Sequence, residues 1–187
     1  MGKLLLSASV AAVILSSQIM PAHAGVVDLR GTAWEKHAKN ECGLDPHLLY
    51  AVALWESKQR AGGGGFVAPS PWALNNAVYG AYYPKNYEDA KRALKRYMAA
   101  STVTDIGISQ VNYRWNGRYV SKPEDLLDVD TNIRVGAKVL CNAIKNSPDD
   151  IVLAIGSYHT PNPELREKAR NYGTNVLRIW KRLIENG

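Results

Sequence analysis

The sequence is poor in cysteine, with only Cys42 and Cys141 among its 187 residues. Neither cysteine stands in a Cys/His cluster with the spacing of metal ligands. Neither has the basic, loop-like surroundings that activate a thiol as a nucleophile. These features argue against a metal site and against a cysteine-dependent enzyme, and no other cofactor is expected.

Other sequence features are missing as well. Beyond the N-terminus, no apolar run is long enough to span a bilayer. The glycines of residues 62–65 are not followed by Lys-Ser/Thr, so they predict a flexible loop rather than a phosphate-binding loop. The chain has no internal repeat and no basic–aromatic motif of a nucleic-acid reader, which excludes nucleic acid as an expected partner.

The first 24 residues have the pattern of a secretory signal peptide. Lys3 supplies a positive charge, residues 4–15 are apolar but too few to span a membrane, and Ala22-His23-Ala24 is a small-x-small cleavage site. We expect cleavage after Ala24, which leaves residues 25–187 as one exported domain with no membrane span. An uncleaved N-terminal anchor is the alternative.

Basic side chains outnumber acidic ones. The formal charge is +6, and removal of the single charge of Lys3 leaves +5. Exported basic domains often meet anionic surfaces, of which a cell wall is one. One group of basic residues alternates with apolar residues at helical spacing, which predicts the solvated face of an amphipathic helix: Lys91, Arg92, Lys95 and Arg96.

In an exported protein, an even number of cysteines predicts a disulfide. A bond between Cys42 and Cys141 would close a loop of about 100 residues, with an entropic contribution limited to about 4–5 kcal/mol. Two buried free thiols are the alternative.

Most of the sequence has helical periodicity. The expected helices cover residues 33–40, 46–57, 87–100, 131–144, 149 or 150 to 158, and 163–184, with Asp45 and Asp130 as N-caps of the second and fourth. Residues 69–84 are expected to be irregular with a short hairpin near 77–83. Residues 105–111 are expected to form a short turn of helix or a loop, in which the one glycine suggests close backbone approach. The prediction is a mainly α fold: one globular domain of about seven helices with little or no sheet.

A single carboxylate, Glu56, ends the apolar stretch Ala51–Trp55. Apolar surroundings raise the pKa of a carboxyl group because desolvation disfavours its charged form. A carboxyl that is protonated near neutral pH can donate a proton to a leaving group, as the cleavage of a glycosidic bond requires. Taken alone, a glutamate on the helix surface is the alternative.

Four segments resemble, in order, the motifs of the soluble lytic transglycosylase family. They are Leu44–Ser57, Asp105–Asn112 (Asp-Ile-Gly-Ile-Ser-Gln-Val-Asn), Leu127–Ala137 and Ala154–Tyr158. The resemblance extends from about Trp34 to Leu183. It implies a lysozyme-like fold, a location in the periplasm, and non-hydrolytic cleavage of the bond between N-acetylmuramic acid and N-acetylglucosamine in peptidoglycan.

The resemblance also implies roles for two residues. Glu56 would donate a proton to the glycosidic oxygen and then accept the proton of the muramoyl 6-hydroxyl, which closes on the anomeric carbon as a 1,6-anhydro end. The muramoyl 2-acetamido group assists, so one carboxylate suffices where ordinary glycosidases use two. Tyr158 would hydrogen-bond Glu56 and orient it, with a buried core tyrosine as the alternative.

Five further residues are expected to bind substrate. Gln110 and Asn112 would line the sugar groove and Ser57 would support the site by hydrogen bonding, although turn-forming and helix-ending roles are the alternatives. Ser109 stands where the family usually has Met, which changes an apolar wall of the groove. His159 stands where the family usually has Asn, and is either a polar contact or a plain surface histidine.

The stretch between Glu56 and Asp105 is longer than in the minimal family. It resembles the branch found with conjugative and integrating elements and with type IV secretion or pilus systems, and the two-cysteine pattern is similar to that branch. Besides glycan strands, components of such an apparatus are therefore expected partners. Trp72 and Tyr83 in this stretch either stack on sugar faces or pack on the core.

Two other functions stay open. One is a hydrolytic muramidase on the same fold, with Asp105 placing a water opposite Glu56; a separation of about 6.5–9.5 Å would favour it. The other is a non-catalytic peptidoglycan-binding scaffold protein. The simpler interpretation of Asp105 is an N-cap or a solvated turn residue.

Overall fold

The computed structural model describes residues 27–61 and 66–185. The signal peptide expected over residues 1–24 and the glycine run of residues 62–65 lie outside this part. Within the described residues there are seven α-helices and six short strands. The prediction of a mainly α fold with about seven helices is therefore confirmed, with a small sheet added.

The helices are α1 (Ala33–Cys42), α2 (Pro46–Ser57), α3 (Tyr87–Ala100), α4 (Tyr113–Asn116), α5 (Val129–Asn146), α6 (Ile151–His159) and α7 (Arg166–Glu185). Three 3-10 turns are η1 (Gly117–Tyr119), η2 (Pro123–Leu127) and η3 (Pro163–Leu165). Strands β1 (Lys58–Ala61) and β2 (Phe66–Pro69) form an antiparallel pair. Strands β3 (Leu74–Asn76), β4 (Gly80–Tyr82), β5 (Thr104–Ile106) and β6 (Val111–Asn112) form an antiparallel sheet in the order β4-β3-β5-β6.

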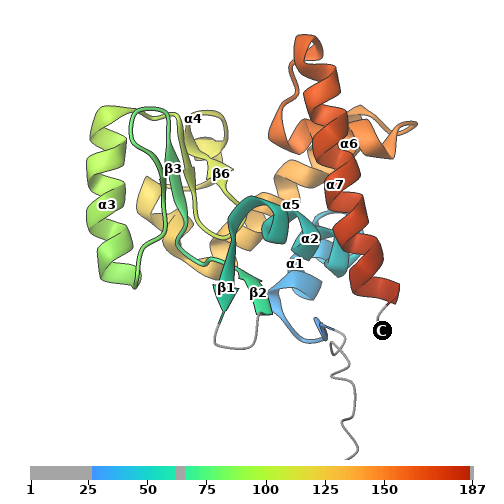
Figure 1. Ribbon diagram of the computed structural model, residues 1–187, viewed down its shortest axis with the longest axis horizontal. Helices are drawn as coiled ribbons and strands as arrows, with labels where there is room; N and C mark the ends of the chain where they lie inside the picture. Colours follow the sequence, from blue (N-terminus) through green and yellow to red (C-terminus); the bar gives the residue numbers. More distant parts are fainter. Residues whose placement is uncertain (1–26, 62–65, 186–187) are drawn as a thin grey trace, which may run out of the picture.

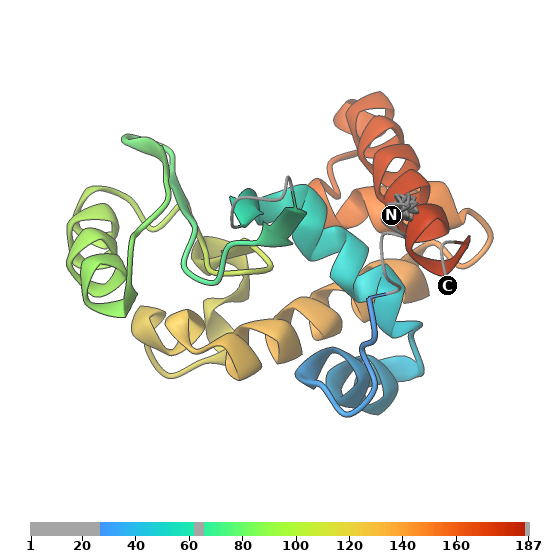
Figure 2. The same ribbon diagram turned by 60° about the horizontal axis from the view of Figure 1, so that its bottom comes forward.

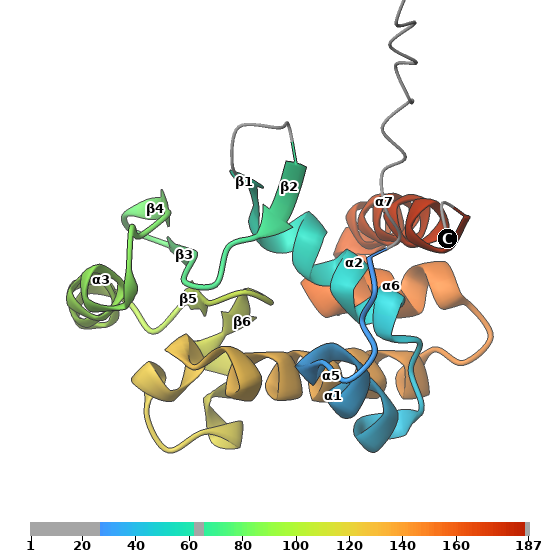
Figure 3. The same cartoon turned by 90° about the horizontal axis from the view of Figure 1, so that it is seen from below.

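The elements gather into two sides that share one helix. Helix α3 and the four-stranded sheet form one side, and α1, α2, α6 and α7 form the other, while α5 runs along both (Figure 1 and Figure 3). Figure 2 shows the β3–β4 hairpin beside α3. Each side has its own apolar core, and α5 contributes Ile133 and Leu140 to one and Val135 to the other.

The ends of α2 and α3 agree with the sequence. The side chain of Asp45 accepts a hydrogen bond from the His47 backbone N–H at 2.8 Å, as expected for an N-cap. Helix α3 covers the expected residues 87–100, and the four basic residues on its outer face are all exposed. The prediction of an amphipathic helix there is confirmed.

The expected start of α5 is wrong. The helix begins at Val129 because Asp128, not Asp130, is its N-cap and accepts a hydrogen bond from the Thr131 backbone N–H at 2.8 Å. Asp130 lies in the first turn instead, where its carboxylate is 3.0 Å from the His37 ring and 3.3 Å from Lys36.

The last helix also begins later than expected. Residues 163–165 form a 3-10 turn, opened by the Asn162 side chain, and α7 starts at Arg166. Leu165, an apolar residue within the expected range 163–184, precedes α7 and is 42% exposed. Because Leu165 belongs to the 3-10 turn, it lies outside the buried face of α7, which includes Ala169, Tyr172 and Val176.

The expected turn of helix at residues 105–111 is wrong, because these residues contain the end of β5, a tight turn and the start of β6. Strand β3 of the β3–β4 hairpin supplies the pairing partner that a single-sequence pattern does not reveal. Gly107 has φ +78°, and a Cβ there would lie 2.6 Å from the carbonyl oxygen of Leu126. The expectation of close backbone approach at this glycine is confirmed.

Cys42 and Cys141 form the expected disulfide, which joins the end of α1 to α5 across 99 positions of sequence. Among the described residues no helix is both long enough and apolar enough to cross a membrane.

Replacing both cysteines by Ser should lower the free energy of unfolding by about 2–4 kcal/mol, because the unfolded chain regains loop entropy. Denaturant titration of the oxidised protein and of the double variant measures the difference. Thiol labelling of the oxidised protein should find no free cysteine, and two reactive thiols would contradict the bond.

Candidate functional site

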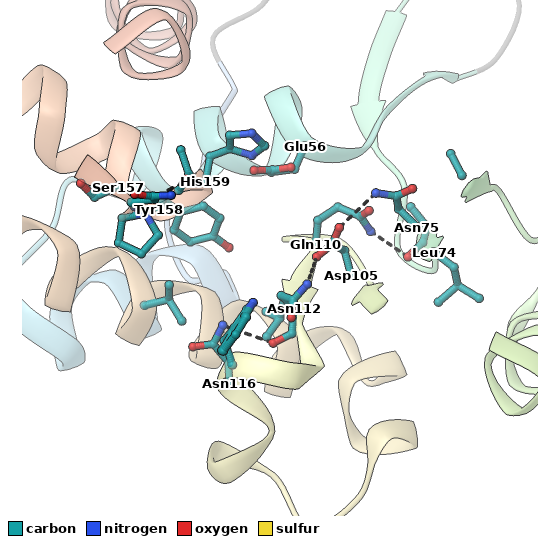
Figure 4. Close-up of a pocket in the computed structure, with 18 of the residues that line it drawn as sticks. Glu56, Leu74, Asn75, Asp105, Gln110, Asn112, Asn116, Ser157, Tyr158 and His159 are labelled. Carbon is teal, nitrogen blue, oxygen red and sulfur yellow. Dashed lines mark hydrogen bonds between the residues drawn. The ribbon is translucent and has the colours of Figure 1, made fainter. Parts of the chain in front are cut away.

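A cavity of about 870 Å³ lies where the two sides of the molecule meet. It is bounded by the end of α2, the four-stranded sheet, α4 and the end of α6 (Figure 4). The volume is at the upper end of the range usual for ligand pockets, about 300–1,000 Å³. The lining residues are Glu56, Ala73, Leu74, Asn75, Ala81, Tyr83, Asp105, Gln110, Val111, Asn112, Trp115, Asn116, Val139, Ser157, Tyr158, His159, Thr160, Pro161, Asn162 and Leu165.

Glu56 enters the cavity from the last turn of α2. The next residue, Ser57, is fully buried, and its hydroxyl donates a hydrogen bond to the Ile108 carbonyl at 2.7 Å. This bond fixes the end of α2 against the turn between β5 and β6. Ser57 does not line the cavity itself; through this hydrogen bond it supports the wall that carries Glu56.

The pKa of Glu56 is raised from 4.5 to about 7. Burial is the largest cause, as the apolar sequence around it predicts, and the negative charge of Asp105 raises the pKa further. A hydrogen bond from Tyr172 acts in the opposite direction because it stabilises the carboxylate. A large part of the Glu56 population is therefore protonated at neutral pH.

The tyrosine that holds Glu56 is Tyr172 on α7. Its hydroxyl donates to Oε1 of Glu56 at 2.6 Å. Tyr158 was expected to make this bond, but its hydroxyl donates to the Ser109 carbonyl at 2.6 Å. The reason is the packing: α7 lies against α2, whereas the end of α6 faces the β5–β6 turn. The sequence placed Tyr172 in the expected helix of residues 163–184 but could not show which helix its hydroxyl would reach.

Gln110 lines the cavity with a backbone in the left-handed region, φ +46°. Its amide nitrogen donates to the carbonyls of Ala73 at 2.8 Å and Gly107 at 2.9 Å. Both amide protons are thus used within the protein, and the amide oxygen remains to accept from a ligand.

Ser109 does not face the cavity. It is 1% exposed, and its Cβ packs tightly on α5. A Cβ added to Gly136 of that helix would lie 2.8 Å from the Ser109 Cβ. The Ser109 backbone N–H donates to the Asn132 side chain at 2.9 Å. The expected change to an apolar wall of the groove is therefore wrong, because Ser109 packs against a helix instead.

Asp105 is the central residue of a polar row that crosses β3, β5 and β6 and faces the cavity. It is paired with Asn75 on one side and with Asn112 on the other. Its Oδ2 accepts from Asn75 at 3.1 Å and its Oδ1 from Asn112 at 2.7 Å (Figure 4). Burial raises the pKa of Asp105, and the two amides oppose this rise. The interpretation of Asp105 as an N-cap or solvated turn residue is wrong.

His159 covers the tyrosine that holds Glu56. Its ring is stacked on Tyr172, with the ring centroids 5.1 Å apart and the planes 5° apart. The ring also lines the cavity, so it is more than a plain surface histidine. Burial and the positive charge of Lys168 lower the pKa of His159 below 6.5, which favours a neutral ring at neutral pH.

Aromatic side chains stand at the margin of the cavity. Tyr83 lines it and is 41% exposed, whereas Trp72 packs against the core of the sheet side. Trp115 on α4, 65% exposed, lines the cavity and was missed in the sequence, as were Asn75 and Asn116. The only sequence signal for Trp115 is its place three residues after Asn112. In the described part of the chain, no group of three or more His, Cys, Asp or Glu could hold a metal ion.

Residues 95–180 match the family model of the Transglycosylase SLT domain. The match supports the lytic transglycosylase family for this chain and includes Asp105, Gln110, Asn112, Tyr158 and Tyr172, but it begins after Glu56. No curated protein and no solved structure matches.

Replacing Tyr172 by Phe should raise the pKa of Glu56 above about 7, because the hydrogen bond that favours the carboxylate is lost. Carbon-13 NMR of the glutamate carboxyls across pH measures it. Tyr158→Phe is the matched control, since it removes a second tyrosine hydroxyl, which donates to the Ser109 carbonyl and not to Glu56, and it should shift the pKa less. A larger shift in the Tyr158 variant would contradict the assignment.

Replacing Glu56 by Gln should stabilise the protein in a pH-dependent way. Between pH 4.5 and about 7 the native state keeps a proton that the unfolded state has lost, so wild-type stability falls as the pH rises through this window. The advantage of Glu56→Gln should therefore grow from pH 4 to pH 8 by about 3 kcal/mol in the free energy of unfolding. Glu167→Gln, at an exposed position on α7, is the control. A pH-independent difference would contradict the raised pKa.

Proposed function

We propose that the protein is a peptidoglycan lytic transglycosylase that cleaves the bond between N-acetylmuramic acid and N-acetylglucosamine and leaves 1,6-anhydro ends. The observation that carries this proposal is Glu56: a carboxyl that is protonated near neutral pH and lies in a large cavity lined by amides and aromatic rings. The match of residues 95–180 to the Transglycosylase SLT domain supports the same substrate.

In the first step Glu56 acts as a general acid. Tyr172 donates to Oε1, so Oε2 is the oxygen that can carry the proton toward a ligand. That proton goes to the glycosidic oxygen, and the bond from the anomeric carbon to this oxygen breaks, with the electron pair remaining on the oxygen. A pKa of about 7 suits a group that must give up a proton and take one back at neutral pH.

In the second step the Glu56 carboxylate acts as a base. It takes the proton of the muramoyl 6-hydroxyl while that oxygen closes on the anomeric carbon, with assistance from the 2-acetamido group. The hydrogen bond from Tyr172 stabilises Glu56 in its charged form between the two steps. One residue thereby serves as acid and then base without net consumption of a proton.

The cavity wall offers groups for sugar recognition. The free amide oxygen of Gln110 can accept from an acetamido N–H or a hydroxyl, and Asn112 has a buried side-chain oxygen without a protein partner. Trp115 and Tyr83 present rings at the margin, where sugar faces can stack. His159 adds a neutral ring that lines the same cavity and is stacked on Tyr172.

Export and biological context belong to the same proposal. The pattern of residues 1–24 supports cleavage after Ala24, which leaves residues 25–187 as a periplasmic catalytic domain, and the disulfide suits that oxidising compartment. The long stretch between Glu56 and Asp105, which forms β1 to β4 and α3, supports a role in local wall opening for a conjugation or secretion apparatus.

One observation favours a second candidate, a hydrolytic muramidase. Asp105 lines the same cavity as Glu56, and its charge contributes to the raised pKa of that residue. Glycosidases that use water employ such a pair of carboxyl groups. The two candidates differ in the acceptor, which is the muramoyl 6-hydroxyl in one and water in the other.

Digestion of purified peptidoglycan followed by mass spectrometry tests the proposal. Wild type should release anhydro-muropeptides, and Glu56→Gln should lower the rate by about 10²-fold or more, because the amide keeps the shape but cannot donate the required proton. Binding of the variant to insoluble peptidoglycan should remain. Release of reducing ends alone would establish the muramidase, and binding without any release by wild type would establish a scaffold protein.

A further inference from the structure

Tyr172 is held between two other rings. It is 5% exposed and does not line the cavity. The Trp55 ring meets it edge to face, with the ring centroids 6.4 Å apart and the planes at 88°. The His159 ring is stacked on it, with the centroids 5.1 Å apart and the planes at 5°. Two helices other than α7 therefore contribute rings that fix the ring whose hydroxyl donates to Glu56.

His159 is the member of this group of rings that faces the cavity. It lines the cavity together with Glu56 (Figure 4), whereas Trp55 and Tyr172 do not line it. His159 is exposed, but Tyr172, on which its ring is stacked, is buried. The imidazole ring thus covers one face of Tyr172 on the side of the cavity.

The place of His159 follows from the close packing of α6 on α7. A Cβ on either Gly156 or Gly173 would collide with backbone atoms of the opposite helix. The two helices therefore touch at their backbones, which only glycine permits at these positions. His159 ends α6 one turn after Gly156, on the same face, and so lies against the helix that carries Tyr172.

Exclusion of water sustains the proton of Glu56. Burial is the largest cause of the raised pKa of this residue, and the hydrogen bond from Tyr172 acts in the opposite direction. Water that reached this bond would solvate the carboxylate and lower the pKa of Glu56 toward its ordinary value. A ring that covers Tyr172 on the side of the cavity therefore helps to keep Glu56 protonated near neutral pH.

The covering ring is itself neutral at neutral pH. Burial and the positive charge of Lys168 lower the pKa of His159, and the negative charge of Asp105 opposes this change. A positive ring in the cavity would favour the charged form of Glu56, because opposite charges attract. A neutral ring covers Tyr172 without this effect.

We propose that His159 is a positioning residue, whose ring holds the ring of Tyr172 in place and keeps cavity water from the hydrogen bond between Tyr172 and Glu56. This inference rests on the proposed function, because it concerns the acid of that reaction. The role requires a flat ring and no hydrogen bond from either imidazole nitrogen. It differs from the role of a polar contact to the sugar, which requires a nitrogen and no stacked ring.

Two substitutions separate the ring of His159 from its nitrogens. His159→Phe keeps a flat ring and removes both nitrogens, whereas His159→Asn keeps polar groups and removes the ring. The kcat for peptidoglycan cleavage should stay within about twofold of wild type in His159→Phe and fall by about tenfold or more in His159→Asn, with little change in KM. A larger loss in His159→Phe, with a raised KM, would indicate a polar contact to the sugar and overturn the inference.

Titration of Glu56 tests the exclusion of water without any substrate. In His159→Asn the pKa of Glu56 should fall below about 7, because water reaches the carboxyl group, whereas in His159→Phe it should stay unchanged. Carbon-13 NMR of the glutamate carboxyls measures both values. The basic limb of the kcat/KM profile should move to lower pH in His159→Asn as well. An unmoved pKa in that variant would contradict the role of His159 as a cover.

The action of His159 through Tyr172 is tested by combining substitutions. In a Tyr172→Phe background, His159→Asn should cost less in kcat than in the wild-type background, because the hydrogen bond that the ring protects is already absent. Equal losses in the two backgrounds would overturn the inference. Asn171→Ala, at an exposed position next to Tyr172 in the sequence, is the control and should match wild type. Circular dichroism and thermal unfolding confirm that each variant is folded.

Failure of the inference and failure of the proposed function give different results. Failure of the proposed function would be visible in the wild type itself, as an absence of peptidoglycan cleavage. The NMR titration does not depend on cleavage, so it tests the role of His159 in either case. Failure of the inference alone leaves wild-type cleavage intact and His159→Asn as active as wild type.

Discussion

The hydrogen bond from the Ser57 hydroxyl to the Ile108 carbonyl joins the end of α2, on one side of the molecule, to the turn between β5 and β6, on the other. It is fully buried, and it fixes the end of the helix that carries Glu56 to the turn that carries Gln110. Burial of such a pair is tolerated only when donor and acceptor are both satisfied, so the relative position of helix and turn is strictly set. The geometry of the cavity follows from this bond.

The turn at residues 107–110 is itself held from several directions. The Asn132 side chain of α5 donates to the Ile106 and Leu126 carbonyls and accepts from the Ser109 N–H. Tyr158 donates to the Ser109 carbonyl from α6. Glycine at position 107 permits the approach of Asn132, since any Cβ there would collide with it. The turn that carries Gln110 is thus held both by Asn132, which does not line the cavity, and by Tyr158, which does.

Periodicity predicted most of the fold because its elements are mainly helices with clear apolar stripes and N-caps. Helix α3 and the start of α2 agree with the sequence, and the raised pKa of Glu56 follows from its apolar surroundings. The strands were largely missed since β5 and β6 each pair with segments whose proximity depends on the tertiary fold. Single residues at helix ends, such as Asp128, decide boundaries that periodicity leaves open.

The candidate site was predicted less completely. A motif shows which side chains lie near each other, but hydrogen-bond partners depend on the crossing of elements distant in sequence. Tyr172 is 116 positions from Glu56 and reaches it only because α7 packs on α2. Ser57 and Ser109 belong to segments that form the site, yet their side chains face inward, because helix and turn each present only some positions to the cavity.

Helix α5 has a consequence for how a substrate is selected. It supplies residues to both apolar cores, and the disulfide ties its later part to α1. A hinge between the two sides would have to bend an 18-residue helix and open both cores. The width of the cavity is therefore set before any ligand arrives, and discrimination rests on fit to a preformed shape rather than on closure around the bound ligand.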